Sequence, residues 1–125
     1  MDETPEKIRD YRDLIVWQEA MDIAADVYAL TRAFPREEMF GMTSQIRRCA
    51  ASIPANIAEG FGRAQRRTFV QYLGIAQGSL KELETHTLLC GRVGLLSATQ
   101  LEDMESRYSR LGKRLVSFIR SLERR

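Results

Sequence analysis

The feature that most constrains the fold of this chain is the spacing of hydrophobic residues between positions 101 and 122. Apolar residues recur there alternately three and four positions apart, at Leu101, Met104, Tyr108, Leu111, Leu115, Phe118 and Leu122. This spacing is typical of a helix that packs lengthwise against other helices, and Ile119 widens the stripe. Ser97 and Gln100 stand where a capping box would begin this helix. The sequence therefore predicts a long amphipathic helix that starts near residue 98.

Two other stretches show the same helical periodicity, at about 13–34 and 67–92. Asp13 is the expected N-cap of the earlier one, and Pro35 ends it. Gly74 and Gly78 stand one turn apart in the later one, where each costs up to about 1 kcal/mol relative to alanine, so close helix approach is expected there. Residues 1–10 are polar and lack a period, which predicts a flexible arm.

A further helix is expected from residue 42 to about 62, although Pro54 lies in the middle of its apolar face. Proline in a helix interior costs roughly 3 kcal/mol, so the helix could end before it. However, Ile46 and Ile57 are eleven residues apart, which at about 100° per residue returns to within roughly 20° of the same direction. We therefore expect one helix kinked at Pro54 that stops at Gly60 and Gly62, which can take left-handed dihedrals. The predicted fold class is all-α, in one domain over residues 1–125.

Three strings of residues carry a resemblance to a known family. The longest consists of 43–48, 52–54 and 56–63, and two more lie at 13–18 and 78–85. Over about residues 11–96 the chain resembles the 23S rRNA intervening-sequence protein family, also called S23. The resemblance implies an up-down antiparallel four-helix bundle that assembles as a ring-like homopentamer. Related accessory proteins of retroelements are thought to bind nucleic acid and a reverse transcriptase.

Composition narrows the class of protein and its location. Hydrophobic residues make up 44% and charged residues 29% of the chain, as in soluble globular proteins. No window approaches 18 uninterrupted apolar residues, and the first residues lack a secretion signal, so a cytoplasmic protein without a membrane span is expected. Cys49 and Cys90 fall on apolar helix faces and are expected to be reduced, buried thiols.

The sequence offers little that resembles catalysis or metal binding. Di-iron helical bundles need two Glu-x-x-His pairs, but His86 is the only histidine here. With Glu82 four residues earlier it forms a single pair, typical of a solvated or interfacial histidine. Cys49 has no histidine on its own helix, and the chain has no paired-histidine zinc helix, nucleophile elbow or glycine-rich phosphate loop. These observations predict no enzyme activity, no cofactor and no metal.

Basic residues are unevenly distributed and suggest contacts with phosphate. Residues 1–46 carry a net charge of −5, whereas residues 47–125 carry +7. One cluster lies between the second and third expected helices and another on the outer face of the last helix, so the candidate nucleic-acid-binding residues are Arg63, Arg66, Arg67, Arg107, Arg110 and Arg114. Arg66 and Arg67 oppose the dipole of the helix that they begin, which indicates another partner. That partner is either a phosphate or an acidic residue of a neighbouring subunit, and the last helix could equally present a solvated face.

A second polar surface is a candidate for contacts between subunits. It lies opposite the apolar face of the kinked helix, where arginine pairing with acidic residues across an interface is expected. The run from Leu14 to Trp17 is wider than one apolar stripe needs, which suggests a second buried contact. The candidate interface residues are Arg47, Arg48, Ser52, Pro54, Asn56, Glu59 and Trp17.

Taken together, these patterns predict a non-enzymatic, oligomeric accessory protein that binds nucleic acid through electrostatic, sequence-tolerant contacts. The expected partners are further copies of itself, a pentamer by resemblance, together with RNA or DNA or a protein partner. The alternative is a protein-interaction scaffold that binds no nucleic acid, in which the basic half complements the acidic first helix of a neighbour.

Overall fold

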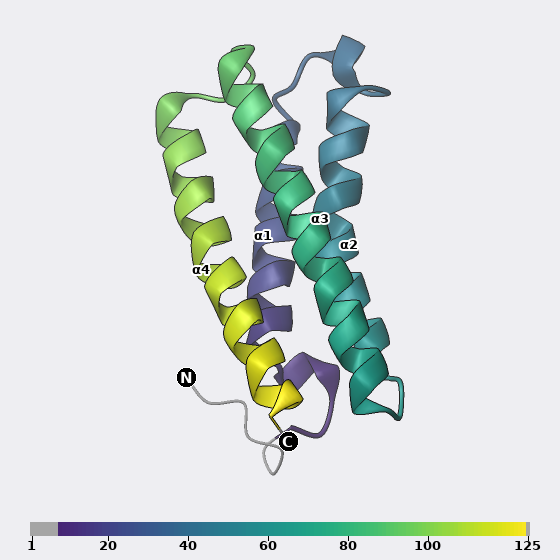
Figure 1. Cartoon of the computed structure of the whole chain (residues 1–125). Helices are drawn as coiled ribbons and strands as arrows, with labels where there is room; N and C mark the ends of the chain where they lie inside the picture. Colours follow the sequence, from purple (N-terminus) through teal and green to yellow (C-terminus); the bar gives the residue numbers. More distant parts are fainter. Residues whose placement is uncertain (1–7, 125) are drawn as a thin grey trace.

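A computed structural model describes residues 8–124 as four long helices that run alternately up and down (Figure 1). The helices are α1 (Ile15–Thr31), α2 (Met42–Phe61), α3 (Arg66–Arg92) and α4 (Ala98–Glu123). Two short 3-10 helices, η2 (Tyr11–Asp13) and η3 (Arg36–Glu38), precede α1 and α2, and the described residues contain no strand. This architecture confirms the predicted all-α, up-down four-helix bundle.

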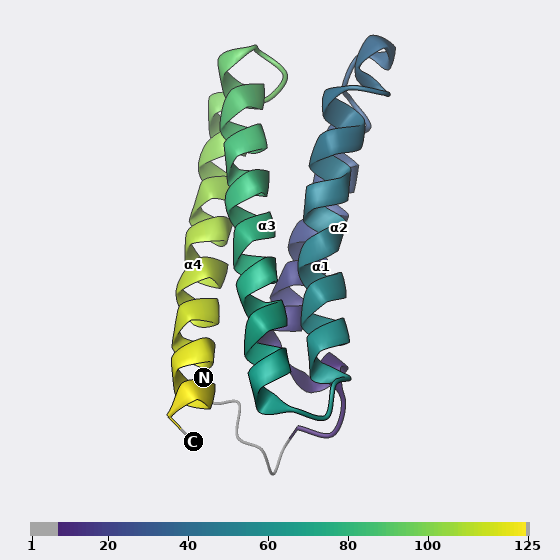
Figure 2. The ribbon, with the colours of Figure 1, turned by 45° about the vertical axis from the view of Figure 1, so that its right-hand side comes forward.

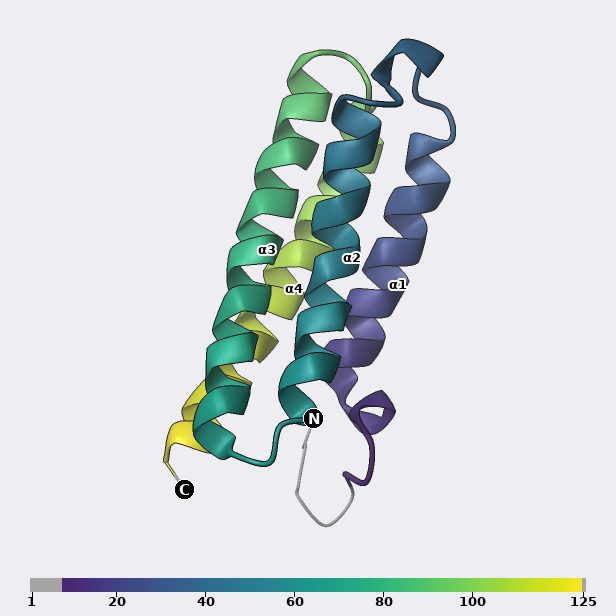
Figure 3. The ribbon, with the colours of Figure 1, turned by 90° about the vertical axis from the view of Figure 1, so that its right-hand side faces the viewer.

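Successive helices lie side by side along their lengths. Helices adjacent in sequence pack most closely, above all α2 against α3, and a smaller contact between α1 and α4 closes the bundle. The views in Figures 2 and 3 show that the link from α2 to α3 lies at the same end as the C-terminus of α4, whereas the other two links lie at the opposite end. The two ends of the molecule therefore present different sets of side chains.

The hydrophobic stripe of α4 faces the core, as its spacing predicts. Met104, Tyr108, Leu111, Leu115 and Leu122 are buried, whereas Leu101 and Phe118 are half-buried. At the start of the helix, the backbone N–H of Gln100 donates to the Ser97 hydroxyl, and the Ser97 N–H donates to the Gln100 side chain. The predicted capping box is thus confirmed.

The second helix passes through Pro54 without interruption, so one helix rather than two is confirmed. Pro54 is buried together with Ile53 and Ile57. Ser52 donates its hydroxyl to the Cys49 carbonyl at 3.0 Å, and Asn56 donates its amide to the Ser52 carbonyl at 2.7 Å. These side-chain bonds lie around the turn in which proline cannot donate. The kink itself stays a prediction.

The expected left-handed ending of α2 is wrong. Gly62 has φ −71°, and within residues 8–124 the positive φ belongs to Gly94 instead. Gly60 serves another purpose, because a Cβ there would lie 2.4 Å from the Cβ of Tyr72 on α3. Its missing side chain lets α2 and α3 approach closely. By contrast, a Cβ at Gly74 or Gly78 would have no atom within 4 Å, so these glycines allow no close approach inside the chain.

The start of the bundle also differs from expectation. Asp10, not Asp13, is an N-cap, and it caps η2, while Leu14 occupies the N-cap position of α1 without a side-chain hydrogen bond. Helix α1 ends at Thr31, before Phe34. Residues 1–7 of the expected arm lie outside the described residues, and Ile8 packs against the core.

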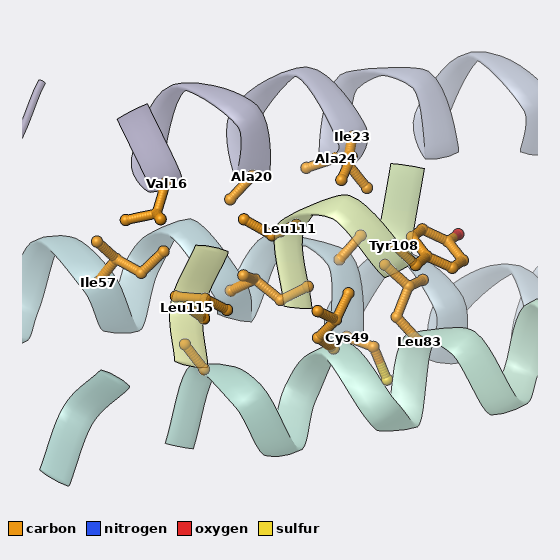
Figure 4. Close-up of a cluster of buried hydrophobic side chains, with 14 of the residues drawn as sticks. Val16, Ala20, Ile23, Ala24, Cys49, Ile57, Leu83, Tyr108, Leu111 and Leu115 are labelled. Carbon is orange, nitrogen blue, oxygen red and sulfur yellow. The ribbon is translucent and has the colours of Figure 1, made fainter. Parts of the chain in front are cut away.

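The core is a continuous cluster to which all four helices contribute. Figure 4 shows part of it, with Val16 and Ala20 of α1, Ile57 of α2, Leu83 of α3 and Leu115 of α4. Cys49 and Cys90 are buried free thiols, as predicted. None of the described helices combines the length and the hydropathy that spanning a membrane requires.

Candidate functional site

Helix α4 carries two basic stripes that face different neighbours. Arg107 forms an ion pair with Asp26 of α1, and Arg114 forms one with Glu19 of the same helix. Both partners belong to the same chain. The positive charge of Arg107 and Arg114 is therefore largely neutralised by partly exposed ion pairs within the chain, which leaves them poorly suited to phosphate contact. Arg110 is exposed and has no ion pair or hydrogen bond among the described residues.

The other basic stripe borders a groove between α3 and α4. The groove has a volume of about 670 Å³, and α3 contributes Lys81 and Glu84 to its wall. From α4 come Lys113, Arg120 and Arg124, which are all exposed and, among the described residues, form no ion pair. We call Lys81, Lys113, Arg120 and Arg124 the basic groove residues. Lys81 pairs with the Glu84 carboxylate at 3.5 Å, so the three cations of α4 make the groove electropositive.

The periodicity of α4 explains why its charges separate in this way. Residues 113, 120 and 124 are spaced seven and four apart, so they share one helix face. Residues 107 and 114 are also seven apart but point toward α1, as their ion pairs show. From the sequence, the basic residues of α4 were placed on one outer face, so the stripe near α1 was not separated from the stripe near α3. The hydrophobic stripe alone, combined with the order of the helices, would have indicated which basic residues border α3.

The link from α2 to α3 holds the other predicted basic cluster. Arg63 lies 3.2 Å from both the Glu59 carboxylate and the Tyr72 hydroxyl, and its guanidinium lies 5.5 Å from the Tyr72 ring centroid. The hydrogen bond with Glu59 is the main cause of the raised pKa of Arg63. Tyr72 also donates to Glu59 at 3.1 Å. Arg63 is thus part of a small surface network.

Arg66 and Arg67 lie beside the end of α4. Arg66 donates to the Leu122 carbonyl at 3.3 Å, in the last turn of α4. This contact places a cation at the negative end of the α4 dipole, which offsets the unfavourable position of Arg66 at the start of α3. Arg67 is exposed and pairs with none of the described residues. Both arginines line a shallow depression that Glu123 borders.

The predicted interface residues divide into three groups. Arg47 donates to the Thr31 hydroxyl at 2.8 Å and lies 4.7 Å from the centroid of the Tyr28 ring, so it joins α2 to α1 within the chain. Arg48 is exposed, and Trp17 packs edge-on against Tyr11 at 5.3 Å. The remaining four are used inside the chain, by burial or by the hydrogen bonds described above: Ser52, Pro54, Asn56 and Glu59.

One side-chain cluster was not foreseen from the sequence. Cys49 of α2 lies beside Glu82 and His86 of α3, and their potential metal-binding atoms all lie within 4.8 Å of one another. Burial, followed by a hydrogen bond with Glu82, raises the pKa of Cys49 to about 12. Glu59 contacts Tyr72 in the α2–α3 hairpin, and the same register places residue 49 opposite residue 82. The cluster can be found only when the antiparallel register of α2 and α3 is known, and spacing along one helix does not give that register.

Comparisons with known proteins agree with this geometry. The sequence model of the family described as 23S rRNA-intervening sequence protein matches residues 12–117. A solved structure of a protein with unknown function from the S23 ribosomal protein family of Bacteroides thetaiotaomicron VPI-5482 is 27% identical, with a TM-score of 0.75. The match covers 84% of this chain and 98% of that one. A comparison with curated proteins found no match.

Proposed function

This chain belongs to the 23S rRNA-intervening sequence protein family, and we propose that it is a non-enzymatic accessory protein that binds the phosphate backbone of nucleic acid. The observation that carries the proposal is the set of basic groove residues. Three of the four belong to α4, and Lys113, Arg120 and Arg124 form no ion pair among the described residues. Phosphate groups are the partners that such a row of cations suits best.

The dimensions of the groove fit a short stretch of polyanion. Residues 113 and 124 are eleven positions apart, which corresponds to about 16 Å along a helix. Successive phosphates of an extended strand can meet the stripe over this length. Arg66 and Arg67 lie beside the end of α4 and extend the positive surface beyond the groove. Arg110 adds an exposed cation elsewhere on α4.

The groove supports contacts that do not depend on base sequence. Its aromatic lining residue, Tyr108, is 1% exposed and donates its hydroxyl inside the bundle, so no base can stack on it. Ser109 and Ser117 offer hydroxyl groups along the wall, which suit phosphate oxygens. We therefore propose an affinity set by charge and salt rather than by base identity.

Assembly would multiply these contacts. By its resemblance to the family, we propose that the chain forms a homo-oligomer, with a pentamer as the specific expectation. Ile75 and Leu89 are 51% and 45% exposed on the outer face of α3, which they share with Gly74 and Gly78. The two exposed apolar side chains, Ile75 and Leu89, favour contact with another subunit. Several grooves in one assembly would bind a polyanion more tightly than one groove.

The same exposed face supports the second candidate function, a protein-interaction scaffold that binds no nucleic acid. In that case the basic groove would receive an acidic segment of a partner protein. Two buried free thiols, Cys49 and Cys90, support the expected cytoplasmic location under either function, because thiols stay reduced there.

A binding titration distinguishes the two functions. Nuclease-treated protein is titrated against labelled RNA and DNA at salt concentrations between roughly 50 and 200 mM. The test variant is Lys113→Ala/Arg120→Ala/Arg124→Ala. Its matched control is Arg32→Ala/Arg36→Ala/Arg92→Ala, which removes three exposed cations from the opposite end of the bundle.

The nucleic-acid proposal expects an affinity that falls steeply with salt. The groove variant should bind at least about tenfold more weakly and lose roughly two to three units of salt slope, about 0.9 for each lost phosphate contact. The control should bind like the unmodified protein. Binding that ignores salt, or that both variants weaken equally, would contradict the proposal. Absence of binding to every nucleic acid tested would favour the scaffold.

A further inference from the structure

The seam between α2 and α3 holds a cluster of three different metal-binding side chains. Glu82 and His86 are four residues apart on α3, so they lie on one helix face. Cys49 reaches the same place from α2. The His86 Nε2 and Glu82 Oε2 atoms are 3.7 Å apart, and all three candidate ligand atoms lie within 4.8 Å of one another. Two helices thus supply sulfur, nitrogen and oxygen donors to one point.

The imidazole of His86 gives a second, independent indication. Its Nε2 atom is buried and has no hydrogen-bond partner among the described residues. The Glu82 oxygen at 3.7 Å is too distant for a hydrogen bond. Buried polar atoms without a partner are rare in folded proteins and require an explanation. A ligand that accepts the lone pair of Nε2 would supply one.

We propose that Cys49, Glu82 and His86 form a binding site for a divalent transition metal ion, with Zn²⁺ as the best fit. Zinc takes thiolate, imidazole and carboxylate ligands at about 2.0 to 2.3 Å in a tetrahedral arrangement, which separates the ligand atoms by roughly 3.3 to 3.8 Å. The observed separations lie within about 1 Å of that range, so rotation of the exposed Glu82 side chain and a small movement of His86 suffice.

The charges of the three ligands also match one divalent cation. The Cys49 thiolate and the Glu82 carboxylate each contribute one negative charge, and the His86 imidazole is neutral when it binds a metal. Binding therefore gives a neutral centre at the edge of the core. The thiol proton leaves to the solvent as the zinc–sulfur bond forms, so each bound ion releases one proton from Cys49.

The position of the cluster indicates what the ion does. Cys49 is 4% exposed, whereas the Glu82 side chain is 58% exposed, so the ion enters from the solvent and retains a water molecule as its fourth ligand. The ion links α2 to α3 and stabilises the folded state against the unfolded one. The site is separate from the basic groove between α3 and α4 and does not depend on the proposed nucleic-acid function.

Cobalt substitution tests the site directly. Tag-free protein is treated with a chelator and titrated with Co²⁺, whose bond to a thiolate produces an intense near-ultraviolet charge-transfer band. We expect one equivalent of Co²⁺ to produce this band and one equivalent of Zn²⁺ to abolish it. Zinc should also raise the melting temperature of the unmodified protein.

The chain offers a matched control for the thiol. Cys90 is the other buried free cysteine, and among the described residues it belongs to no group of three potential metal ligands. Cys49→Ser should remove the charge-transfer band and weaken zinc binding at least about 100-fold, whereas Cys90→Ser should leave both unchanged. If Cys49→Ser does not fold, His86→Gln tests the site through a half-buried residue. It should retain the helical circular dichroism spectrum but lose the zinc-dependent rise in melting temperature.

Three results would overturn the proposal. One is the absence of a thiolate band and of saturable zinc binding in the unmodified protein. Another is equal loss of the band in Cys49→Ser and Cys90→Ser. The third is unchanged zinc affinity in Glu82→Gln or His86→Gln, which would show that the cluster does not bind the ion.

Discussion

The buried hydroxyl groups of Thr87 and Tyr108 lie 2.8 Å apart and join α3 to α4. Thr87 also donates to the Leu83 carbonyl at 2.8 Å. A hydroxyl has one proton to donate, so the Tyr108 hydroxyl is the donor between the two side chains. Both residues are buried, and burial raises the pKa of Tyr108 to about 12.

This arrangement predicts unequal effects for two conservative substitutions. Thr87→Val removes the acceptor and leaves the buried Tyr108 hydroxyl without a partner, which should lower the free energy of unfolding by about 1 to 3 kcal/mol. Tyr108→Phe leaves Thr87 bonded to Leu83 and should cost only about 0.5 to 1.5 kcal/mol. Urea denaturation of both variants measures the difference. A larger cost for Tyr108→Phe would contradict this assignment of donor and acceptor.

Alanine substitutions at glycine should have opposite effects at two positions. Gly60→Ala places a methyl group 2.4 Å from the Tyr72 Cβ, so we expect it to lower the free energy of unfolding by about 1 to 3 kcal/mol. A Cβ at Gly78 would have no atom within 4 Å, so Gly78→Ala should raise the free energy of unfolding by up to about 1 kcal/mol through the higher helix propensity of alanine. Thermal and urea unfolding of the two variants test this contrast, and equal effects would contradict it.

A carboxyl group at the α3–α4 contact should make stability depend on pH. Burial and the neighbouring Glu84 carboxylate raise the pKa of Glu105 to about 7, from an ordinary value of 4.5. Between pH 4.5 and pH 7 the folded state therefore keeps the Glu105 proton, whereas the unfolded chain releases it. The protonated Glu105 contributes its full stabilisation below pH 4.5, and this stabilisation is lost as the pH rises through 7. Because solvent screens this partly exposed group, we expect the free energy of unfolding to fall by roughly 1 kcal/mol over this pH range.

Glu105→Gln provides the comparison for this pH dependence. Glutamine imitates the protonated carboxyl group but does not titrate, so the variant should be more stable than the unmodified protein at pH 8 and nearly equal to it at pH 4. Urea denaturation across this interval measures the difference between the two proteins. A difference that does not change with pH would contradict the raised pKa of Glu105.

Replacement of Pro54 tests the role of the proline inside α2. Pro54→Ala restores a backbone donor and avoids a cost of roughly 3 kcal/mol, although the smaller side chain leaves a space in the core. We expect the helical circular dichroism spectrum to persist and the free energy of unfolding to change by about 1 kcal/mol or less. Light scattering would report whether the mass of the assembly changes. Loss of helical structure would contradict the continuous register through residue 54.

Local patterns were enough to predict the elements of the fold. The stripe of α4 and its Ser97 cap depend on residues within one helix, so the sequence displays them directly. The register from Ile46 to Ile57 likewise revealed that α2 continues through Pro54. Each of these features is determined by neighbours along the chain.

Features that depend on contact between helices were not predictable in the same way. Gly60 was interpreted as a turn former, yet it is helical and accommodates Tyr72 of the next helix. Arg107 and Arg114 were grouped with Arg110 on one outer face, because the rotation of α4 toward Asp26 and Glu19 appears only when the bundle is assembled.

The same reason explains why the metal-binding cluster escaped prediction. Cys49 was compared with residues of its own helix, where no histidine exists. His86 lies 37 positions later in the sequence and reaches Cys49 only through the pairing of α2 with α3. Spacing rules for single helices therefore cannot detect a site that two helices share.

The order in which the helices pack also determines how the chain can fold. Because helices adjacent in sequence pack most closely, most contacts are local in sequence. Chains with such low contact order fold in about microseconds to milliseconds. The α1–α4 seam is the exception, since it joins the two most distant helices and closes the largest loop. Arg107–Asp26 and Arg114–Glu19 lie on that seam, so we expect these ion pairs to form late and mainly to slow unfolding rather than speed folding.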